Sequence, residues 1–275
     1  MSVAWMERPG RIAAAFAAAR RAGRPALIPY VTGGDPDLAA TREIVLALGR
    51  AGADIVEIGV PFSDPIADGV VNQRAAERAL KQGVTLGRIL DLAAVLRRDG
   101  APPLVLFTYY NPIHRMGIDR FAATAQAAGV DGVLVTDLPI EESAQLDQAL
   151  RPAGIDLIAL LAPTSGPERI ARVLDAGRGF VYFIARTGVT GARADLPEDL
   201  ERQVRAARTA AGGRVPVAVG FGIGNRRQVE TVGAFADGVV VGSALVRLIE
   251  ETGAVPDLPA RVEAFVRDLA GTGAG

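Results

Sequence analysis

The chain has 275 residues, of which 49% are hydrophobic and 22% are charged, and its formal net charge is -1. This composition is typical of a globular protein with a sizeable core, and it excludes the basic surface that nucleic acid or an anionic membrane would need. The chain has no cysteine, which excludes disulfides, thiolate metal sites and a cysteine nucleophile. We expect a cytoplasmic protein without a membrane span or a signal peptide, because its apolar runs are too short for either.

The first element is an amphipathic segment, 11–23, which we expect to form an extra helix on the floor of the domain. Longer helical patterns then alternate with short β-branched runs, and sequences such as Gly52-Ala53-Asp54 mark the return from helix to strand. The predicted strands are 26–31, 54–59, 103–108, 131–136, 156–161, 180–185, 215–220 and 237–242.

Near-continuous apolar strands separated by helices favour a parallel sheet that is covered on both faces. Eight such units in about 250 residues predict an α/β fold, a (β/α)8 TIM barrel with an extra N-terminal helix. We expect one domain over residues 1–275, with the last few residues disordered. An open doubly wound sheet is the alternative, although TGGDP rather than GxGxxG follows the first strand.

In such a barrel the functional loops follow the carboxyl ends of the strands. Glu57 stands within the strand 54–59, and alternation places it on the inward face together with Ile55 and Gly59. A carboxyl group buried there has a raised pKa and can exchange protons near neutral pH. A structural glutamate paired with an arginine or a tyrosine is the alternative. Asp68 follows in the next loop, where it is either a second functional carboxylate or an ordinary turn residue.

Glycine-rich turns follow the last two strands, in GFGIGN (220–225) and GSA (242–244), and each leads into a helix. Backbone N–H groups at two neighbouring helix starts predict a site for a phosphate monoester. The segment 186–195 is either a lid or an ordinary exposed loop. An apolar pocket for a flat ligand is indicated by aromatic residues at strand ends, some of which also serve the core: Tyr30, Phe107, Tyr109, Tyr182 and Phe221.

The scarcity of lysine and histidine excludes further classes of catalytic mechanism. Lys81 is the single lysine and stands in a helical pattern, which disfavours a Schiff base. His114 is the single histidine and is expected in a surface loop, so neither a zinc site nor a serine triad is predicted. Proton transfer by carboxylates on a phosphorylated substrate remains, with no metal.

The segment VEIGVPFSDPIADG (56–69) resembles the tryptophan synthase alpha subunit, as do LIPYVTGGDP (27–36), RTGVTGAR (186–193), VGFGI (219–223) and VVGSA (240–244). The resemblance runs from about residue 11 to residue 252. It implies a lyase of tryptophan biosynthesis that cleaves indole-3-glycerol phosphate to indole and glyceraldehyde 3-phosphate. It also implies an α2β2 complex with a beta subunit, which holds the pyridoxal phosphate, and no cofactor in this chain.

The same resemblance implies that Glu57 is the acid and base of the reaction, that Asp68 accepts the indole N–H, and that Tyr182 lies beside Glu57. The implied substrate-binding residues are Tyr30, Phe107, Tyr109, Leu134, Thr190, Gly191, Gly220, Phe221, Gly222, Gly242 and Ser243. The loops that resemble those facing the beta subunit contain Asp64, Pro65, Asn111 and Pro139.

Two residues depart from the pattern of that family. Asn72 occupies a position associated with an isoleucine near the ring, and Thr136 replaces a small residue or proline before Asp137. These changes affect the shape of the pocket rather than the class of reaction. Three alternatives stay open, namely another phosphate-binding barrel enzyme, a non-catalytic barrel that regulates a partner, and an enzyme that releases indole on its own.

Overall fold

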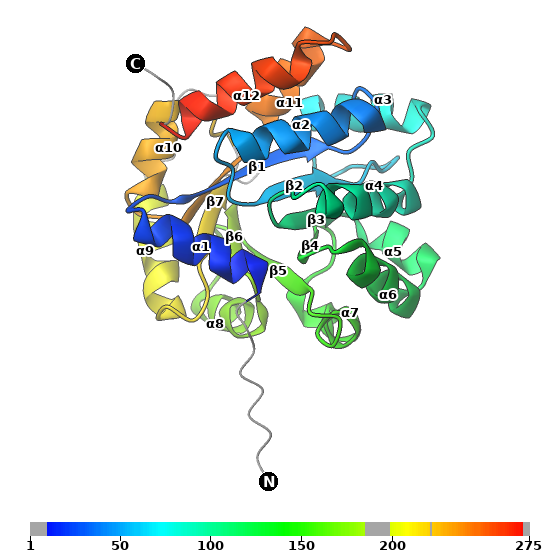
Figure 1. Cartoon of the computed structure of the whole chain (residues 1–275). Coiled ribbons are helices and arrows are strands. Elements are labelled where there is room, and N and C mark those ends of the chain that lie inside the picture. The colour runs from blue at the N-terminus through cyan, green and yellow to red at the C-terminus, as the bar shows by residue number, and fades with distance from the viewer. Residues whose placement is uncertain (1–9, 185–198, 221, 272–275) are drawn as a thin grey trace.

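The structure, a computed structural model, describes residues 10–184, 199–220 and 222–271 (Figure 1). Eight parallel strands close into a barrel in sequence order, which confirms the predicted fold class. Six of the strands begin one or two residues later than predicted, which is the usual uncertainty of element ends. The strands are β1 (Ala26–Thr32), β2 (Val56–Gly59), β3 (Leu104–Thr108), β4 (Gly132–Val135), β5 (Asp156–Leu161), β6 (Val181–Ile184), β7 (Val217–Gly220) and β8 (Gly238–Val241).

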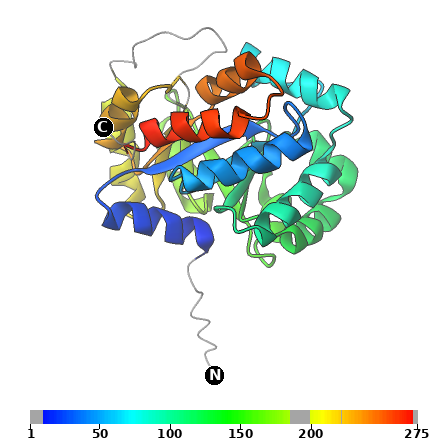
Figure 2. The same ribbon diagram turned by 45° about the horizontal axis from the view of Figure 1, so that its top comes forward.

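Helices form the outer layer, and the last of them, α12, lies side by side with α2 (Figures 1 and 2). Within the described residues, no helix has the length and apolar character needed to cross a membrane. The helices are α1 (Arg11–Arg21), α2 (Leu38–Arg50), α3 (Val70–Lys81), α4 (Leu86–Arg98), α5 (Tyr110–Met116), α6 (Ile118–Ala128), the 3-10 turn η1 (Ile140–Glu142), α7 (Ala144–Leu150), α8 (Pro167–Ala176), α9 (Leu200–Ala211), α10 (Arg226–Gly233), α11 (Ser243–Thr252) and α12 (Leu258–Leu269).

The segment around His114 is helical, so the predicted loop there is wrong. Pro112 stands in the first turn of α5, where proline is tolerated because its missing N–H would have no intrahelical partner. The side chain of His114 is exposed, as expected.

Helix α1 closes the end of the barrel at which the strands begin. Its residues Ile12 and Phe16 pack in one cluster with inward-facing strand residues such as Ile28 and Ile55. The rings of Phe16 and Phe180 have their centroids 5.6 Å apart. The predicted extra helix therefore seals the floor of the barrel, and a ligand can enter the interior only from the opposite end.

Aspartates at the starts of strands recur on this floor. Each carboxylate accepts the backbone N–H of a residue in the neighbouring strand and also contacts an arginine, such as Arg24 or Arg208. The three bonds join Asp54 to Leu27 at 2.8 Å, Asp131 to Leu104 at 2.9 Å and Asp237 to Val217 at 3.0 Å. The aspartates thus satisfy ladder ends that would otherwise lack a partner.

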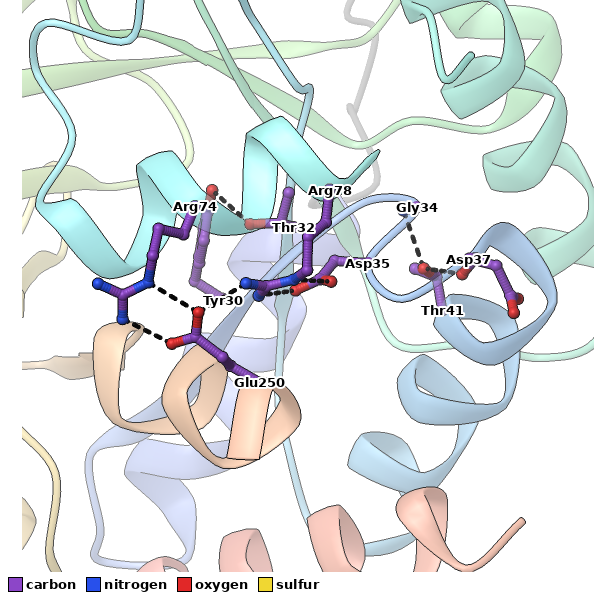
Figure 3. A network of polar contacts seen from close by, with 9 residues as sticks. All are labelled: Tyr30, Thr32, Gly34, Asp35, Asp37, Thr41, Arg74, Arg78 and Glu250. Carbon is purple, nitrogen blue, oxygen red and sulfur yellow. Dashed lines mark hydrogen bonds and ion pairs between the residues drawn. The ribbon is translucent and has the colours of Figure 1, made fainter. Parts of the chain in front are cut away.

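A network of ion pairs joins the loop after β1 to helices α3 and α11 (Figure 3). Arg78 donates two hydrogen bonds, both of 2.8 Å, to the buried carboxylate of Asp35 and a third, of 2.6 Å, to Glu250. Arg74 also binds Glu250, with distances of 2.7 and 2.6 Å. Helix α3 begins next to Asp68, and α11 begins at the predicted phosphate loop. The network therefore holds the loop that contains Asp68 and the predicted phosphate loop in place relative to each other.

Candidate active site

Glu57 is fully buried inside the barrel, where its register partners are Tyr30 on β1 and Val105 on β3. Burial raises the pKa of its carboxyl group to about 8. Neither carboxyl oxygen has a hydrogen-bond partner among the described residues. No arginine or tyrosine in that part of the chain bonds to it, so the geometry favours a reactive glutamate over a structural one.

Two tyrosines stand close to Glu57. Tyr30 and Tyr182 are buried, and burial raises the pKa of both hydroxyls well above the ordinary value, with a further rise from the nearby carboxylates. A side chain at Gly59 would collide with the Tyr30 hydroxyl, and one at Gly220 would collide with the Tyr182 hydroxyl. The glycines at these two strand ends therefore make room for the phenols, a steric role that the sequence did not indicate.

Asp68 lies in the loop between β2 and α3 and is 9% exposed. Tyr109 donates its hydroxyl hydrogen to the carboxylate at 2.8 Å, and the Tyr109 oxygen accepts the N–H of Ala67 at 3.0 Å. Gln73 holds the main chain, because its amide donates to the carbonyl of Asp68 at 2.9 Å. Burial raises the pKa of Asp68, and the hydrogen bond from Tyr109 and the nearby side chain of Asn72 partly offset that rise.

The two departures from the family pattern lie close to this pair. The side chain of Asn72 lowers the pKa of Asp68, and that of Thr136 lowers the pKa of Tyr109, so each stands beside one of the two groups. The hydroxyl of Thr136 also reaches the carbonyl of Thr108, at 3.3 Å. These positions beside Asp68 and Tyr109 were not predicted, although the unusual polar residue at each place was a sequence signal.

Aromatic rings form the walls of the site. Tyr30 and Phe107 meet edge to face with centroids 5.3 Å apart, and Phe62 stacks on Tyr109 at 4.9 Å. Leu134 is fully buried in the cluster inside the barrel. Phe62 was not singled out from the sequence, although it stands in the same strand-to-helix loop as Asp68. These rings surround the two carboxyl groups with apolar surface.

The two glycine-rich turns lie against each other. A side chain at Gly224 would approach the side chain of Ala244 to 2.9 Å, so the loop before α10 touches the first turn of α11. Gly222 has a φ of 86°, a conformation that favours glycine, and nothing lies within 4 Å of the space where its side chain would be. The expected convergence of the two loops is therefore present.

The starts of α10 and α11 differ in their capping. The side chain of Asn225 accepts the N–H of Gln228 at 2.9 Å, so α10 caps itself. Helix α11 follows Gly242 without a side-chain cap, and its first residue, Ser243, is exposed. An anion would find uncapped amides at α11 rather than at α10. Thr190, Gly191, Phe221 and the segment 186–195 lie outside the described residues, as do residues 272–275.

The structure is a closed β/α barrel whose second strand carries a buried glutamate with no hydrogen-bond partner in the described residues, and the next loop holds a second buried carboxylate. This arrangement is typical of an enzyme and can transfer protons. The family model "Tryptophan synthase alpha chain" matches residues 16–270. The chain belongs to the tryptophan synthase alpha chain family.

Individual relatives agree with this assignment. The tryptophan synthase alpha chain of Geobacter sulfurreducens is 50% identical over 259 residues, which cover 94% of this chain and 97% of the relative. Tryptophan synthase of Mycobacterium tuberculosis has a TM-score of 0.87 at 38% identity, covering 96% of this chain and 98% of that one. The tryptophan synthase a2b2 complex of Pyrococcus furiosus has a TM-score of 0.83 at 41% identity, covering 90% and 98%.

Proposed function

We propose that Glu57 and Asp68 carry out the reaction of this family, the cleavage of indole-3-glycerol phosphate to indole and glyceraldehyde 3-phosphate in tryptophan biosynthesis. The observation that carries the proposal is the state of Glu57, which is fully buried, has no hydrogen-bond partner in the described residues, and has a pKa of about 8. At neutral pH this group is protonated, and it can give its proton to C3 of the indole ring.

The remaining steps follow from that protonation. The ring becomes an iminium-like cation, and its N–H donates to the carboxylate of Asp68. Glu57, now ionised, takes the proton of the hydroxyl on the carbon attached to C3. That carbon becomes the aldehyde of glyceraldehyde 3-phosphate as the carbon–carbon bond breaks, and the bonding electrons restore the aromatic indole. The protonated ring is the electron sink, so these steps need no imine or metal.

Neighbouring side chains keep the site dry and hold the ring. Tyr182, which we also place in the catalytic machinery, has its hydroxyl above Gly220 and helps to exclude water from Glu57. Phe107 and Tyr30 provide the apolar surface for the indole, together with Leu134. In a water-free site a proton transfer of this kind contributes about 10²- to 10⁴-fold to the rate.

We place the phosphate of the substrate at the first turn of α11, on the amides of Gly242 and Ser243. The uncapped helix start supports this placement, as does the contact of this turn with the loop after Gly222. Three residues outside the described part of the chain complete the proposed substrate contacts by resemblance: Thr190, Gly191 and Phe221.

A beta subunit is the proposed partner, in an α2β2 complex that holds pyridoxal phosphate on the beta side only. Large apolar side chains are exposed beside the active-site loop, with Ile66 at 80% and Val70 at 57%. Asp64, in the loop after β2, and Asn111, in the first turn of α5, are exposed at the same end of the barrel. An apolar patch next to the site entrance fits a docking face through which indole leaves. A cytoplasmic location is part of the proposal.

The direct test is incubation of the purified chain with indole-3-glycerol phosphate, with and without a cognate beta subunit, while indole is measured. We expect indole from the chain alone and a higher rate in the complex. Glu57→Gln should lose at least about 100-fold of the rate. Glu77→Gln is the matched control, since Glu77 is exposed on α3 and pairs with Lys81. Indole release by Glu57→Gln at the control rate would refute the assignment. A wild-type chain that binds the beta subunit but releases no indole would support a non-catalytic barrel.

A further inference from the structure

The side chain of Asn72 contains the one buried side-chain oxygen, apart from those of Glu57, that lacks a hydrogen-bond partner in the described residues. Leaving a buried acceptor without a donor is costly, and proteins avoid it unless a ligand or a water completes the bond. Asn72 stands in the first turn of α3, and its neighbour Val71 packs with Tyr30 and Phe107. The orphaned oxygen therefore lies on the helix that borders the aromatic cluster, on a side chain next to Asp68.

The orientation of the amide follows from its neighbour. The side chain of Asn72 stabilises the ionised form of Asp68, and an ionised carboxylate only accepts, so the NH2 group of Asn72 faces Asp68. The carbonyl oxygen Oδ1 then points away from that carboxylate. Tyr109 donates to the other side of the same carboxylate, at its Oδ2 atom. Asp68 and Asn72 together present two acceptors to whatever lies between them and the aromatic wall.

We propose that Asn72 is a specificity-determining residue whose Oδ1 atom accepts a hydrogen bond from the ring N–H of the bound substrate, shared with the carboxylate of Asp68. The proposal rests on the proposed function, since it takes the indole ring as the occupant of the pocket. It goes further in assigning the recognition of the ring N–H to a pair of residues on α3 and the loop before it.

The chemistry of the substrate selects this donor. Indole-3-glycerol phosphate offers only three kinds of donor, which are its ring N–H, its glycerol hydroxyls and any protonated phosphate oxygen. The hydroxyls belong beside Glu57 and the phosphate beside α11, so the ring N–H is the donor left for the Asp68 end of the pocket. As positive charge develops on the ring nitrogen, the N–H becomes a stronger donor, and a second acceptor stabilises the charged ring more than the neutral one.

The experiment compares two uncleavable ligands, an indole that carries a 3-propyl phosphate chain and its benzothiophene counterpart, in which sulfur replaces the N–H. Dissociation constants are measured by calorimetry for the wild type and for Asn72→Leu, which is close in volume but has no polar atom. We expect the preference of the wild type for the indole ligand to fall by about 3- to 10-fold in Asn72→Leu, the contribution of one neutral hydrogen bond. Glu77→Ala, on the outer face of the same helix, should keep the wild-type preference.

The ratio of two dissociation constants on one preparation does not depend on the fraction of folded protein, and Asn72→Ala provides a second variant if the leucine perturbs the helix. An unchanged preference in both Asn72 variants would overturn the proposal while leaving the proposed function intact. A wild type that binds neither ligand and releases no indole would instead refute the proposed function. A fall in affinity for both ligands by the same factor would also overturn the proposal, since it would assign Asn72 a packing role only.

Discussion

Tyr109, at the end of β3, donates its hydroxyl hydrogen to Asp68, in the loop after β2, over a distance of 2.8 Å. The bond joins two neighbouring strands of the barrel at the end where the substrate enters. It orients the carboxylate and favours its ionised form, against the opposing effect of burial. The proposed partner of the indole N–H is therefore held by another residue of the pocket rather than by solvent.

The variant Tyr109→Phe tests whether the hydroxyl of Tyr109 stabilises the ionised form of Asp68. Without the hydroxyl, the pKa of Asp68 should rise, so the acid limb of kcat/KM against pH should move to higher pH. We expect a loss of about 10-fold in kcat/KM at acid pH, the value of one hydrogen bond to a charged group. Tyr110→Phe is the control, because Tyr110 faces His114 on α5. If the acid limb of the pH profile stays at its wild-type position in Tyr109→Phe, the hydroxyl of Tyr109 does not stabilise the ionised form of Asp68.

The pKa of Glu57 predicts an alkaline limit of activity. The protonated form starts the reaction, and its pKa is raised from 4.5 to about 8 by burial. kcat/KM should therefore fall as the pH rises through about 8, since this parameter reports the free enzyme. The measurement is a pH profile of indole release between pH 6 and 10. Activity that is constant across that range would show that the protonated glutamate is not the acid.

Glu57 also predicts how stability depends on pH. Its pKa is higher in the folded chain than in the unfolded chain, so the folded state binds this proton more tightly. The contribution of this proton to the free energy of unfolding is complete below about pH 4.5 and disappears as the pH rises to about 8. Glu57→Gln, which is neutral throughout, should match the wild type at pH 5 and exceed it by roughly 2–4 kcal/mol at pH 9 in urea unfolding. Equal stabilities at pH 9 would mean that Glu57 is solvated.

Gly220 tests the steric role of the strand-end glycines. Gly220→Ala places a methyl group into the Tyr182 hydroxyl and ring, which should destabilise the fold by about 1–3 kcal/mol and lower kcat. Tyr182→Leu removes the obstacle, so the double variant should be more stable than the sum of the single changes predicts. Gly87→Ala, in helix α4 with no close neighbour, should be slightly stabilising. Strictly additive effects at Gly220 and Tyr182 would exclude the proposed collision.

Arg78 tests the network of Figure 3. Arg78→Met leaves the carboxylate of Asp35 buried without its charged partner, which should cost about 3 kcal/mol in urea unfolding. Arg74→Met should cost less than about 1 kcal/mol, because Arg74 is half exposed and binds only Glu250. The addition of Asp35→Asn to Arg78→Met should recover part of the loss. If the two arginine variants are equally stable, the buried pair with Asp35 is not what holds α3 in place.

The local sequence pattern was sufficient to predict the strands and the side of the strand on which the Glu57 side chain lies. Side chains alternate along a strand with a period of two, so one apolar face determines where every other residue points. The structure has Glu57 fully buried, as that alternation requires. The same reasoning failed for the segment around His114, because Pro112 resembles a loop signal but is compatible with the first turn of a helix.

The local sequence pattern could not predict which distant residues contact each other. Asp68 and Tyr109 are 41 residues apart, and Arg78 and Glu250 are 172 apart, so no periodicity along the chain relates them. Asn72 and Thr136 were visible as unusual residues, but the position of one beside Asp68 and of the other beside Tyr109 depends on the register between strands. Phe62 escaped notice for the same reason, since its stacking on Tyr109 is a contact between two loops.

The eight β/α units, the inward carboxyl group and the glycine turns could be predicted from the amino-acid sequence, because each depends on the side-chain period or on the backbone conformation of a few residues. Contacts across the barrel determine that Tyr109 bonds to Asp68 with Asn72 nearby, and that Glu57 has no hydrogen-bond partner in the described residues. Closure of the barrel brings separate strand ends together and removes them from water. Those two effects, proximity and desolvation, shift the pKa values on which the proposed chemistry depends.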